Sequence, residues 1–423
     1  MNIFAKLIWA LCLFIPSIVI AEPVNTKHLD SLYEQRKIND GDEIGIIHIY
    51  SEFPKYGWVK DPIEGVSAID DISRALVFYS GLYSHQPDPK VMDKMIHLTR
   101  SILLMQAENG YFYNFIYPDN SINKSYKTSV AEPNWWTWRA LWALATAYPS
   151  INTQDTKLAA QMHNVLFTSL STLPGYVKET QTLTTLHGIT LPAWMPNGGA
   201  DQAAIMLLAQ TRAQQISPQP NIASMMKTLA NGMMTMQIRD PASPINGVFL
   251  SWKNTWHGYG NNQAYALLEA GALLEDRDMI KAAFVELDNF HPYLIEQGYL
   301  TSFTVSQQDH RIQMSDKQQF SQIAYIFRPM IFANLPAYEI SRDTRYIDQA
   351  VTLAMWFYGS NVAKAQMYFP HTGLAFDGLD SKEAVNRNSG AESTVEALLA
   401  LDAIERSPLA KKRLEERLKH VKP

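Results

Sequence analysis

"IDDISRALVFY", residues 69–79, opens with two aspartates and then turns apolar. A helix that is apolar on almost every side has to be buried. The same change from polar or aromatic to apolar recurs in "WWTWRALWAL" from Trp135, "ADQAAIMLLA" from Ala200, "NNQAYALLEA" from Asn261 and "ESTVEALLAL" from Glu392. Buried helices that start alike predict a repeat whose members share one environment.

Each predicted buried helix is followed by a second helix, and strand-like segments follow several of these pairs. The expected pairs are 67–84 with 88–108, 133–148 with 155–173, 199–214 with 219–238, 259–275 with 277–291, 319–339 with 343–359, and 389–406 with either 408–420 or the N-terminal 28–37. The strand-like segments are 110–117, 247–252, 298–305 and 367–376. A helix pair plus a β-loop gives a period of roughly 60 residues, which is typical of a repeat architecture.

Six helical hairpins predict an all-α fold, an (α/α)6 toroid with short β-loops at the active-site rim. The buried helices form the inner ring, because they need protein on every side. Their N-termini then share one rim with the β-loops. We expect the functional site at this rim.

The quoted segments resemble a known group of proteins. "IDDISRALVFY", "GYFYNF" at 110–115, "WRALWALATAY" at 138–148 and "GAESTVEALL" at 390–399 are similar to motifs of the six-hairpin glycosidase-like superfamily. In particular they resemble the uncharacterised toroid domains of bacterial glycan-processing proteins, which carry D-N-A-R-A-L, G-x-F-x-N-F, R-A-L-W-A-L and A-E-S-T segments. The resemblance implies a toroid that handles carbohydrate, and it leaves hydrolysis, elimination and epimerisation open. Asp71 departs from the pattern, which has Asn there.

The N-terminus predicts export. Lys6 precedes the apolar stretch "LIWALCLFIPSIVI", and Ala21 follows it, which is typical of a signal peptide spanning 1–21. An uncleaved anchor is the alternative. We expect a periplasmic or secreted protein, with an N-terminal extension containing a strand at 22–60, the toroid at 61–423 and no stable membrane insertion after cleavage.

The amino-acid composition limits which reactions and which partners are possible. Cys12 is the only cysteine and lies in the predicted signal peptide, so disulfides, thiolate metal sites and cysteine nucleophiles are excluded from the mature chain. A net charge of −5 argues against a nucleic-acid partner, because phosphate binding needs a basic surface. No nucleotide-binding or zinc-protease motif occurs. We therefore expect a carbohydrate partner and neither a cofactor nor a metal; the oligomeric state stays open.

Four carboxylates at the helix starts are the candidate catalytic groups: Asp70, Asp71, Asp201 and Glu392. Hydrolysis of a glycosidic bond needs two carboxyl groups, one to donate a proton and one to activate water or attack. The alternative for Asp70 and Glu392 is a capping box, because each stands three residues after a serine. Asp71 lies one residue beyond the box, so it is the carboxylate expected to be free for the cavity.

The candidate substrate-binding residues are aromatic, cationic or amide side chains near the same rim. Tryptophan rings match the apolar faces of sugars. Arginines inside apolar helices bind an anionic group or, alternatively, pair with a buried carboxylate such as Glu392 or Glu396. The candidates are Trp135, Trp136, Trp194, Arg74, Arg139, Arg328, His257, Tyr259, Asn262 and Gln263.

Carboxylate-catalysed hydrolysis of an oligo- or polysaccharide is the first functional hypothesis. A polysaccharide lyase or sugar epimerase with His257 and Tyr259 as base and acid is the second. The third is a non-catalytic carbohydrate-binding or assembly protein, in which the carboxylates at the rim only cap helices.

Overall fold

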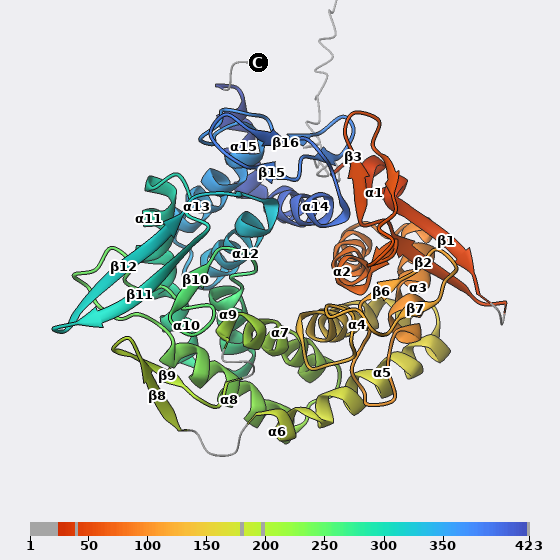
Figure 1. Cartoon of the computed structure of the whole chain (residues 1–423), viewed down its shortest axis with the longest axis horizontal. Helices are drawn as coiled ribbons and strands as arrows, with labels where there is room; N and C mark the ends of the chain where they lie inside the picture. Colours follow the sequence, from red (N-terminus) through yellow and green to blue (C-terminus); the bar gives the residue numbers. More distant parts are fainter. Residues whose placement is uncertain (1–23, 39–40, 178–181, 196–198, 421–423) are drawn as a thin grey trace, which may run out of the picture.

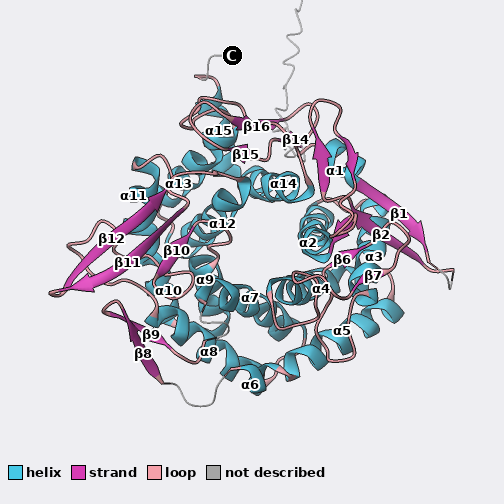
Figure 2. Cartoon of the chain, viewed as in Figure 1, coloured by secondary structure: helices cyan, strands magenta, loops and turns pink. Residues whose placement is uncertain are grey.

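The computed structural model describes residues 24–38, 41–177, 182–195 and 199–420. The predicted signal peptide, residues 1–21, lies outside the described residues. The helices form two concentric rings around a central axis, and most strands lie toward one rim or at the periphery (Figures 1 and 2).

The inner ring is the set of helices that the repeat predicts. Its members are α2 (Ile69–His85), α4 (Trp135–Asn152), α7 (Ala200–Ile216), α9 (Gln263–Leu274), α12 (Ala324–Ser341) and α14 (Ala391–Arg406). Each helix contacts the next, and α14 contacts α2, so the ring closes. The expected all-α fold, an (α/α)6 toroid, is confirmed.

The outer ring consists of the partner helices α3 (Pro89–Leu104), α5 (Thr156–Ser171), α8 (Pro220–Thr235), α10 (Arg277–Val285), α13 (Arg345–Ala354) and α15 (Pro408–Leu418). Shorter helical segments are α1 (Lys27–Leu32), α6 (Leu173–Tyr176), the π-helix η2 (Glu286–Phe290), α11 (His291–Glu296) and the 3-10 helix η3 (Met355–Phe357). Of the two partners proposed for the sixth inner helix, the C-terminal segment forms the outer helix α15. The N-terminal segment instead forms α1, which also packs on α14, and the strand that follows it.

The strands pair only with antiparallel neighbours. They are β1 (Tyr33–Lys37) with β2 (Glu43–Ile47), β3 (Tyr50–Glu52) with β4 (Gly57–Val59), β5 (Ser67–Ala68) with β6 (Phe115–Ile116) and β7 (Ile122–Asn123), β8 (Leu183–Leu186) with β9 (Ile189–Pro192), β10 (Thr255–His257) with β11 (Ser302–Gln308) and β12 (Arg311–Gln318), β13 (Tyr368–Phe369) with β14 (Leu374–Ala375), and β15 (Gly378–Leu379) with β16 (Val385–Asn386). Among the expected segments, 298–305 overlaps β11 and 367–376 spans β13–β14. Only the end of 110–117 becomes a strand, and 247–252 makes isolated bridges.

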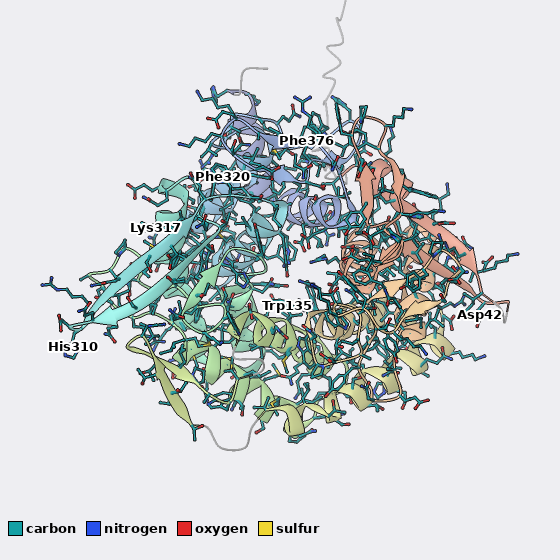
Figure 3. All side chains as sticks on the ribbon, viewed as in Figure 1. Asp42, Trp135, His310, Lys317, Phe320 and Phe376 are labelled. Atoms are coloured by element: carbon teal, nitrogen blue, oxygen red, sulfur yellow. The ribbon has the colours of Figure 1, made fainter. Side chains whose placement is uncertain are left out.

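The core fills the space between and within the two rings. Trp138 and Trp142 on α4 are buried, as expected for core residues. Trp135, at the start of the same helix, lies at the inner edge of the ring, whereas Asp42 and His310 lie at its outer edge (Figure 3). The start of α4 therefore lies beside the central axis.

The capping boxes, which were the alternative for Asp70 and Glu392, do not form. Helix α14 has Gly390 as its N-cap and α2 has Ala68, and neither start has a side-chain cap. Asp377 takes over at α14: its Oδ1 accepts the Gly390 N–H at 2.8 Å and the Ser393 hydroxyl at 2.5 Å. Asp70 and Glu392 are consequently available for other partners, which are arginines.

Candidate active site

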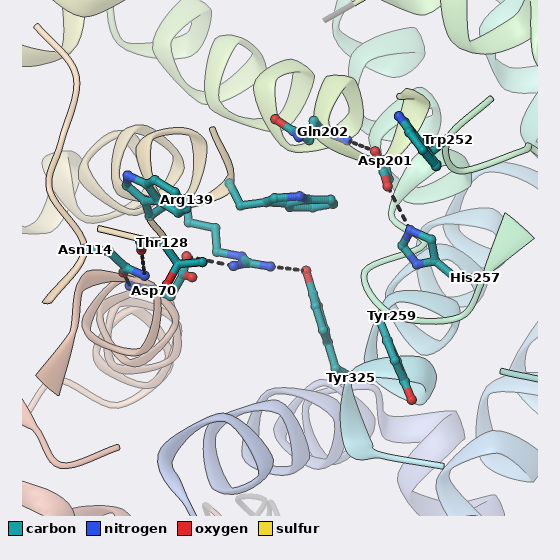
Figure 4. A pocket seen from close by; sticks show the side chains of 12 residues that line it. Asp70, Asn114, Thr128, Arg139, Asp201, Gln202, Trp252, His257, Tyr259 and Tyr325 are labelled. Carbon is teal, nitrogen blue, oxygen red and sulfur yellow. Dashed lines mark hydrogen bonds and ion pairs between the residues drawn. The ribbon is translucent and has the colours of Figure 1, made fainter. Parts of the chain in front are cut away.

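A pocket of about 530 Å³ opens where the inner helices begin. This volume lies within the range of small-molecule sites, about 300–1,000 Å³. Its lining mixes charged, amide and aromatic side chains, and Figure 4 shows them converging from several inner helices and loops. The lining residues are Asp70, Asn114, Thr128, Trp135, Trp136, Arg139, Asp201, Gln202, Trp252, His257, Tyr259 and Tyr325.

Asp201 and His257 form a hydrogen-bonded pair on one wall of the pocket. His257 Nε2 lies 2.9 Å from Asp201 Oδ2, and the other oxygen, Oδ1, accepts the backbone N–H of Gln202 at 2.6 Å. Asp201 is buried, with 4% of its surface exposed, whereas the His257 side chain is 28% exposed. His257 Nδ1 is buried and has no hydrogen-bond partner among the described residues. The carboxylate thus orients the imidazole through one ring nitrogen and leaves the other unengaged.

Ser251 holds both members of this pair in place. Its carbonyl accepts the Asp201 N–H at 3.2 Å, and its hydroxyl accepts the His257 N–H at 3.0 Å. The start of α7 and the strand β10 are therefore tied to the same loop residue. A change in this loop moves the carboxylate and the imidazole together.

Arg139 faces the pair from the opposite side of the pocket (Figure 4). Its Nη1 lies 2.7 Å from Asp70 Oδ1, and its Nη2 donates to the Tyr325 hydroxyl at 2.9 Å. The guanidinium also lies over the Trp135 ring, 5.1 Å from the centroid. Arginine stays charged in proteins, so the pocket holds a fixed cation that Asp70 neutralises.

Aromatic rings make up much of the remaining wall. Trp136 is buried, and its indole N–H donates to the carbonyls of Phe112 and Val130. Trp252 is 45% exposed. With Trp135 they form an aromatic lining of the kind that contacts the apolar faces of a sugar.

A second set of arginines forms a buried ion-pair network outside the pocket lining. Arg74 lies 2.7 Å from Glu392 and 3.0 Å from both Asp71 and Glu396. Arg328 lies 2.6 Å from the same Glu396. The alternative interpretation of these arginines, a buried pair with Glu392 or Glu396, is confirmed for Arg74, and Arg328 pairs with Glu396.

Asn262 and Tyr325 also contact this network. Asn262 Oδ1 accepts from Arg328 at 2.8 Å, and Gln263 is buried beside it at the start of α9. Neither amide lines the pocket. The Tyr325 ring lies 4.9 Å from the guanidinium carbon of Arg74 and 5.4 Å from that of Arg328. Tyr325 therefore connects the network to the pocket, where its hydroxyl meets Arg139.

The expectation that Asp71 is free for the cavity is wrong. Asp71 is 4% exposed, does not line the pocket and accepts a hydrogen bond from Arg74 at 3.0 Å. Burial, with Glu392 and Asp70 nearby, raises the pKa of Asp71 to about 7, although Arg74 opposes the rise. The residue one position past the supposed box points into the protein, and Asp70 faces the pocket instead.

Trp194 and Glu392 also lie away from the central pocket. Trp194 is buried beside the outer helix α8, so close that a side chain added at Gly232 would meet its ring. Trp194 was expected in a binding site, but it does not line the central pocket. The Glu392 side chain is 43% exposed and lines a neighbouring pocket.

The pocket thus brings together seven of the predicted site residues and adds others. Those brought together are Asp70, Asp201, Trp135, Trp136, Arg139, His257 and Tyr259. Asn114, Thr128, Gln202, Trp252 and Tyr325 were not among the predicted site residues. Tyr325 follows Ala324 at the start of α12, so the helix-start pattern extended to this helix would have found it.

Comparisons with known proteins support the fold. No family model matches the chain, and no curated protein matches it in sequence. Among solved structures, the cellobiose 2-epimerase from Spirochaeta thermophila is similar with a TM-score of 0.60 and 13% identity, over 89% of this chain and 91% of that one. A D-mannose isomerase has a TM-score of 0.60 and 12% identity, covering 90% and 96%. The family 76 glycoside hydrolase (mannosidase) from Bacteroides thetaiotaomicron has a TM-score of 0.55 and 11% identity, covering 90% and 97%.

The chain is therefore an (α/α)6 toroid, the architecture of these carbohydrate-processing enzymes. At such identities the likeness concerns the fold. Within the described ranges, no helix is both long and apolar enough to cross a membrane. No cluster of three metal-ligating side chains of the His, Cys, Asp or Glu type occurs in the same part of the chain.

Proposed function

We propose that the protein is a sugar isomerase or epimerase that moves a proton at the carbon next to a sugar carbonyl. The Asp201–His257 pair, opposite Arg139 in an aromatic pocket, is the observation that carries the proposal. A base and a fixed cation on opposite sides of a bound sugar are what such a proton transfer needs.

The proposed step begins with an open-chain aldose in the pocket. The Asp201–His257 pair takes the proton from C2, and the C–H electron pair forms a C1–C2 double bond while the carbonyl oxygen becomes an enediolate oxygen. Arg139 stabilises that negative charge, and Asp201 holds the imidazole and stabilises its protonated form. Return of the proton to C1, together with transfer of the O2 proton to O1, gives a ketose, and protonation of C2 on its other face gives the epimer.

The Tyr325 hydroxyl lines the pocket and can assist proton transfer, whereas the Tyr259 hydroxyl already donates to the carbonyl of Ser321. Burial raises the pKa of Tyr259, with Glu392 and Asp380 adding to the rise, so its hydroxyl stays protonated at neutral pH. Tyr325 accepts from Arg139, which leaves its own proton available to a substrate oxygen. Epimerisation needs such a second donor at C2, and isomerisation needs a group that moves the proton from O2 to O1.

The pocket suits one or two sugar units better than a long polysaccharide. Its volume is that of a small-molecule site. The similar solved structures include a cellobiose 2-epimerase and a D-mannose isomerase, which supports neutral sugars as the first substrates to test.

The test is a product assay on a defined panel. The purified protein is incubated with glucose, mannose, fructose, and the di- and trisaccharides of the cello- and manno-series, and products are separated by chromatography. We expect an epimer or ketose to form, and His257→Gln and Asp201→Asn to lower kcat/KM by about 10²–10⁴-fold. Turnover that survives both substitutions contradicts the proposed roles.

Glycoside hydrolysis is the second candidate, because two carboxylates, Asp70 and Asp201, line the pocket. In this case one of them protonates the leaving oxygen and the other activates water. Asp70 already pairs with Arg139 at 2.7 Å, whereas Asp201 pairs with His257, so neither carboxylate is unpartnered, and hydrolysis ranks second. New reducing ends in the panel assay would favour it, and unsaturated products from uronate-containing glycans would favour elimination.

We also propose that the protein is exported and loses residues 1–21. The sequence pattern of the N-terminus supports this part of the proposal. N-terminal sequencing of protein recovered from an exporting bacterial host is the test. A new terminus at Glu22 is expected, and an intact Met1 on membrane-bound protein would favour the anchor instead.

A further inference from the structure

A second, smaller pocket of about 260 Å³ lies beside the proposed active site. Polar side chains from three chain segments line it, together with the edge of β3: Tyr50, Ser321, Asp377, Asp380, Asn386, Glu392 and Ser393. We call it the outer pocket. Glu392 keeps 43% of its side chain exposed there, even though Arg74 holds one of its oxygens.

One thin wall separates the outer pocket from the central one. The ring of Tyr259 lines the central pocket, and its hydroxyl donates to the carbonyl of Ser321, which lines the outer pocket. The Ser321 hydroxyl in turn donates to Asp380 Oδ1 at 2.9 Å. In Figure 4 the Tyr259 hydroxyl points away from His257, toward the outer side of the site. The two pockets are therefore neighbours across the hydrogen bond between Tyr259 and Ser321.

An aromatic edge borders the outer pocket. Among the described residues, most of the exposed large apolar side chains lie in the segment 50–63, and they include Tyr50 at 39% and Phe53 at 48%. The Tyr50 hydroxyl donates to Glu64 at 2.6 Å, which fixes its ring. Rigid, exposed aromatic rings beside hydrogen-bonding side chains suit a sugar, which has apolar faces and a hydroxyl edge.

We infer that the outer pocket binds the second unit of an oligosaccharide whose first unit occupies the central pocket. Glu392, Asp380 and Asn386 accept or donate hydrogen bonds to its hydroxyl groups, and Tyr50 packs on its ring. The carboxylates disfavour an acidic unit, so the ligand class is a neutral or amino-sugar oligosaccharide. The inference rests on the proposed function only in that the central pocket binds sugar.

Binding as a function of chain length tests the inference without relying on turnover. Calorimetric titration with glucose, cellobiose and cellotriose, and with the matching manno-series, measures Kd for each length. We expect the disaccharide of the better series to bind at least about 10-fold more tightly than its monosaccharide, which is about 1.4 kcal/mol.

Tyr50→Ala and Tyr50→Phe form a matched pair of variants. The alanine variant loses the ring and should bind the disaccharide about 3–10-fold more weakly, with monosaccharide affinity unchanged. The phenylalanine variant keeps the ring but loses the hydroxyl bond to Glu64, and it should bind the disaccharide more tightly than the alanine variant. Leu183→Ala, at an exposed position on β8, is the control for loss of a surface apolar side chain.

The outcomes separate this inference from the proposed function. Equal affinity for mono- and disaccharides, or an equal loss at every length in Tyr50→Ala, overturns the outer pocket as a subsite. Length-dependent binding without any epimer or ketose product overturns the proposed reaction and leaves the subsite standing. Binding of no sugar in the panel overturns both.

Discussion

Glu286 is a buried carboxyl group outside the pocket, and its substitution tests how the protein stabilises the loop that holds the site. It is the first residue of η2 and is 3% exposed, and its Oε1 accepts the N–H of Phe249 at 3.2 Å. No cation pairs with it among the described residues. Phe249 belongs to the loop that carries Ser251, which holds Asp201 and His257. Glu286 thus anchors this loop as a buried carboxyl group.

Burial raises the pKa of Glu286 from 4.5 to about 8, although the Phe249 N–H opposes the rise. The folded state therefore keeps a proton that the unfolded state releases, so stability falls as pH rises from 4.5 to 8. At about 1.4 kcal/mol per pH unit, the loss between pH 5 and pH 8 is on the order of 3–4 kcal/mol. Glu286→Gln cannot ionise and removes this pH dependence.

The assay is urea unfolding of the wild type and Glu286→Gln at several pH values from 5 to 8.5. The difference in unfolding free energy between the two proteins cancels the other titrating groups, and it should shift by about 3–4 kcal/mol in favour of the variant across this range. Glu108→Gln, at an exposed position, is the matched control. A flat difference curve for Glu286→Gln would refute the reasoning.

Two further predictions concern the buried charges and the tryptophans. Glu396→Gln removes the carboxylate shared by Arg74 and Arg328, so the free energy of unfolding should fall by about 3–5 kcal/mol, and an unchanged melting curve would contradict the ion-pair network. Trp194→Ala should cost about 3–5 kcal/mol of stability and leave KM unchanged, because that ring is core, whereas Trp135→Ala should raise KM about 3–10-fold. Steady-state kinetics and thermal melts on both variants check the contrast, and a raised KM in Trp194→Ala would contradict it.

The ring of helices could be predicted from the sequence because burial leaves a periodic trace. An inner helix of a toroid is covered by two neighbours and an outer helix, so it reads as apolar all round. The stretch from Ile69 onward shows this plainly. The short strands were harder, because a two-residue strand such as β6 carries almost no pattern of its own.

The sequence predicted where the site residues lie, but it did not predict which of them interact with one another. Asp201 and His257 were expected at the rim, and both line the pocket. Their pairing joins α7 to β10, and no local pattern reports a contact between residues so far apart in the chain. The capping boxes failed for the same reason, because Asp377 reaches α14 from a separate loop.

Asp71 shows how one helical step changes a role. Neighbouring residues on a helix point about 100° apart, so of Asp70 and Asp71 only one faces the pocket. The sequence favoured Asp71 because it appeared free of a capping duty. Arg74, one turn further along the same helix, binds it instead.

Proton exchange with solvent at the substrate carbon tests the central claim most directly. In deuterated water, nuclear magnetic resonance of a sugar that the protein converts should show deuterium at C2 or C1 of the product, and the exchange should fall by at least about 100-fold in His257→Gln. Product that forms without deuterium at either carbon, with a rate that does not depend on His257, would contradict the claim that this pair transfers the proton.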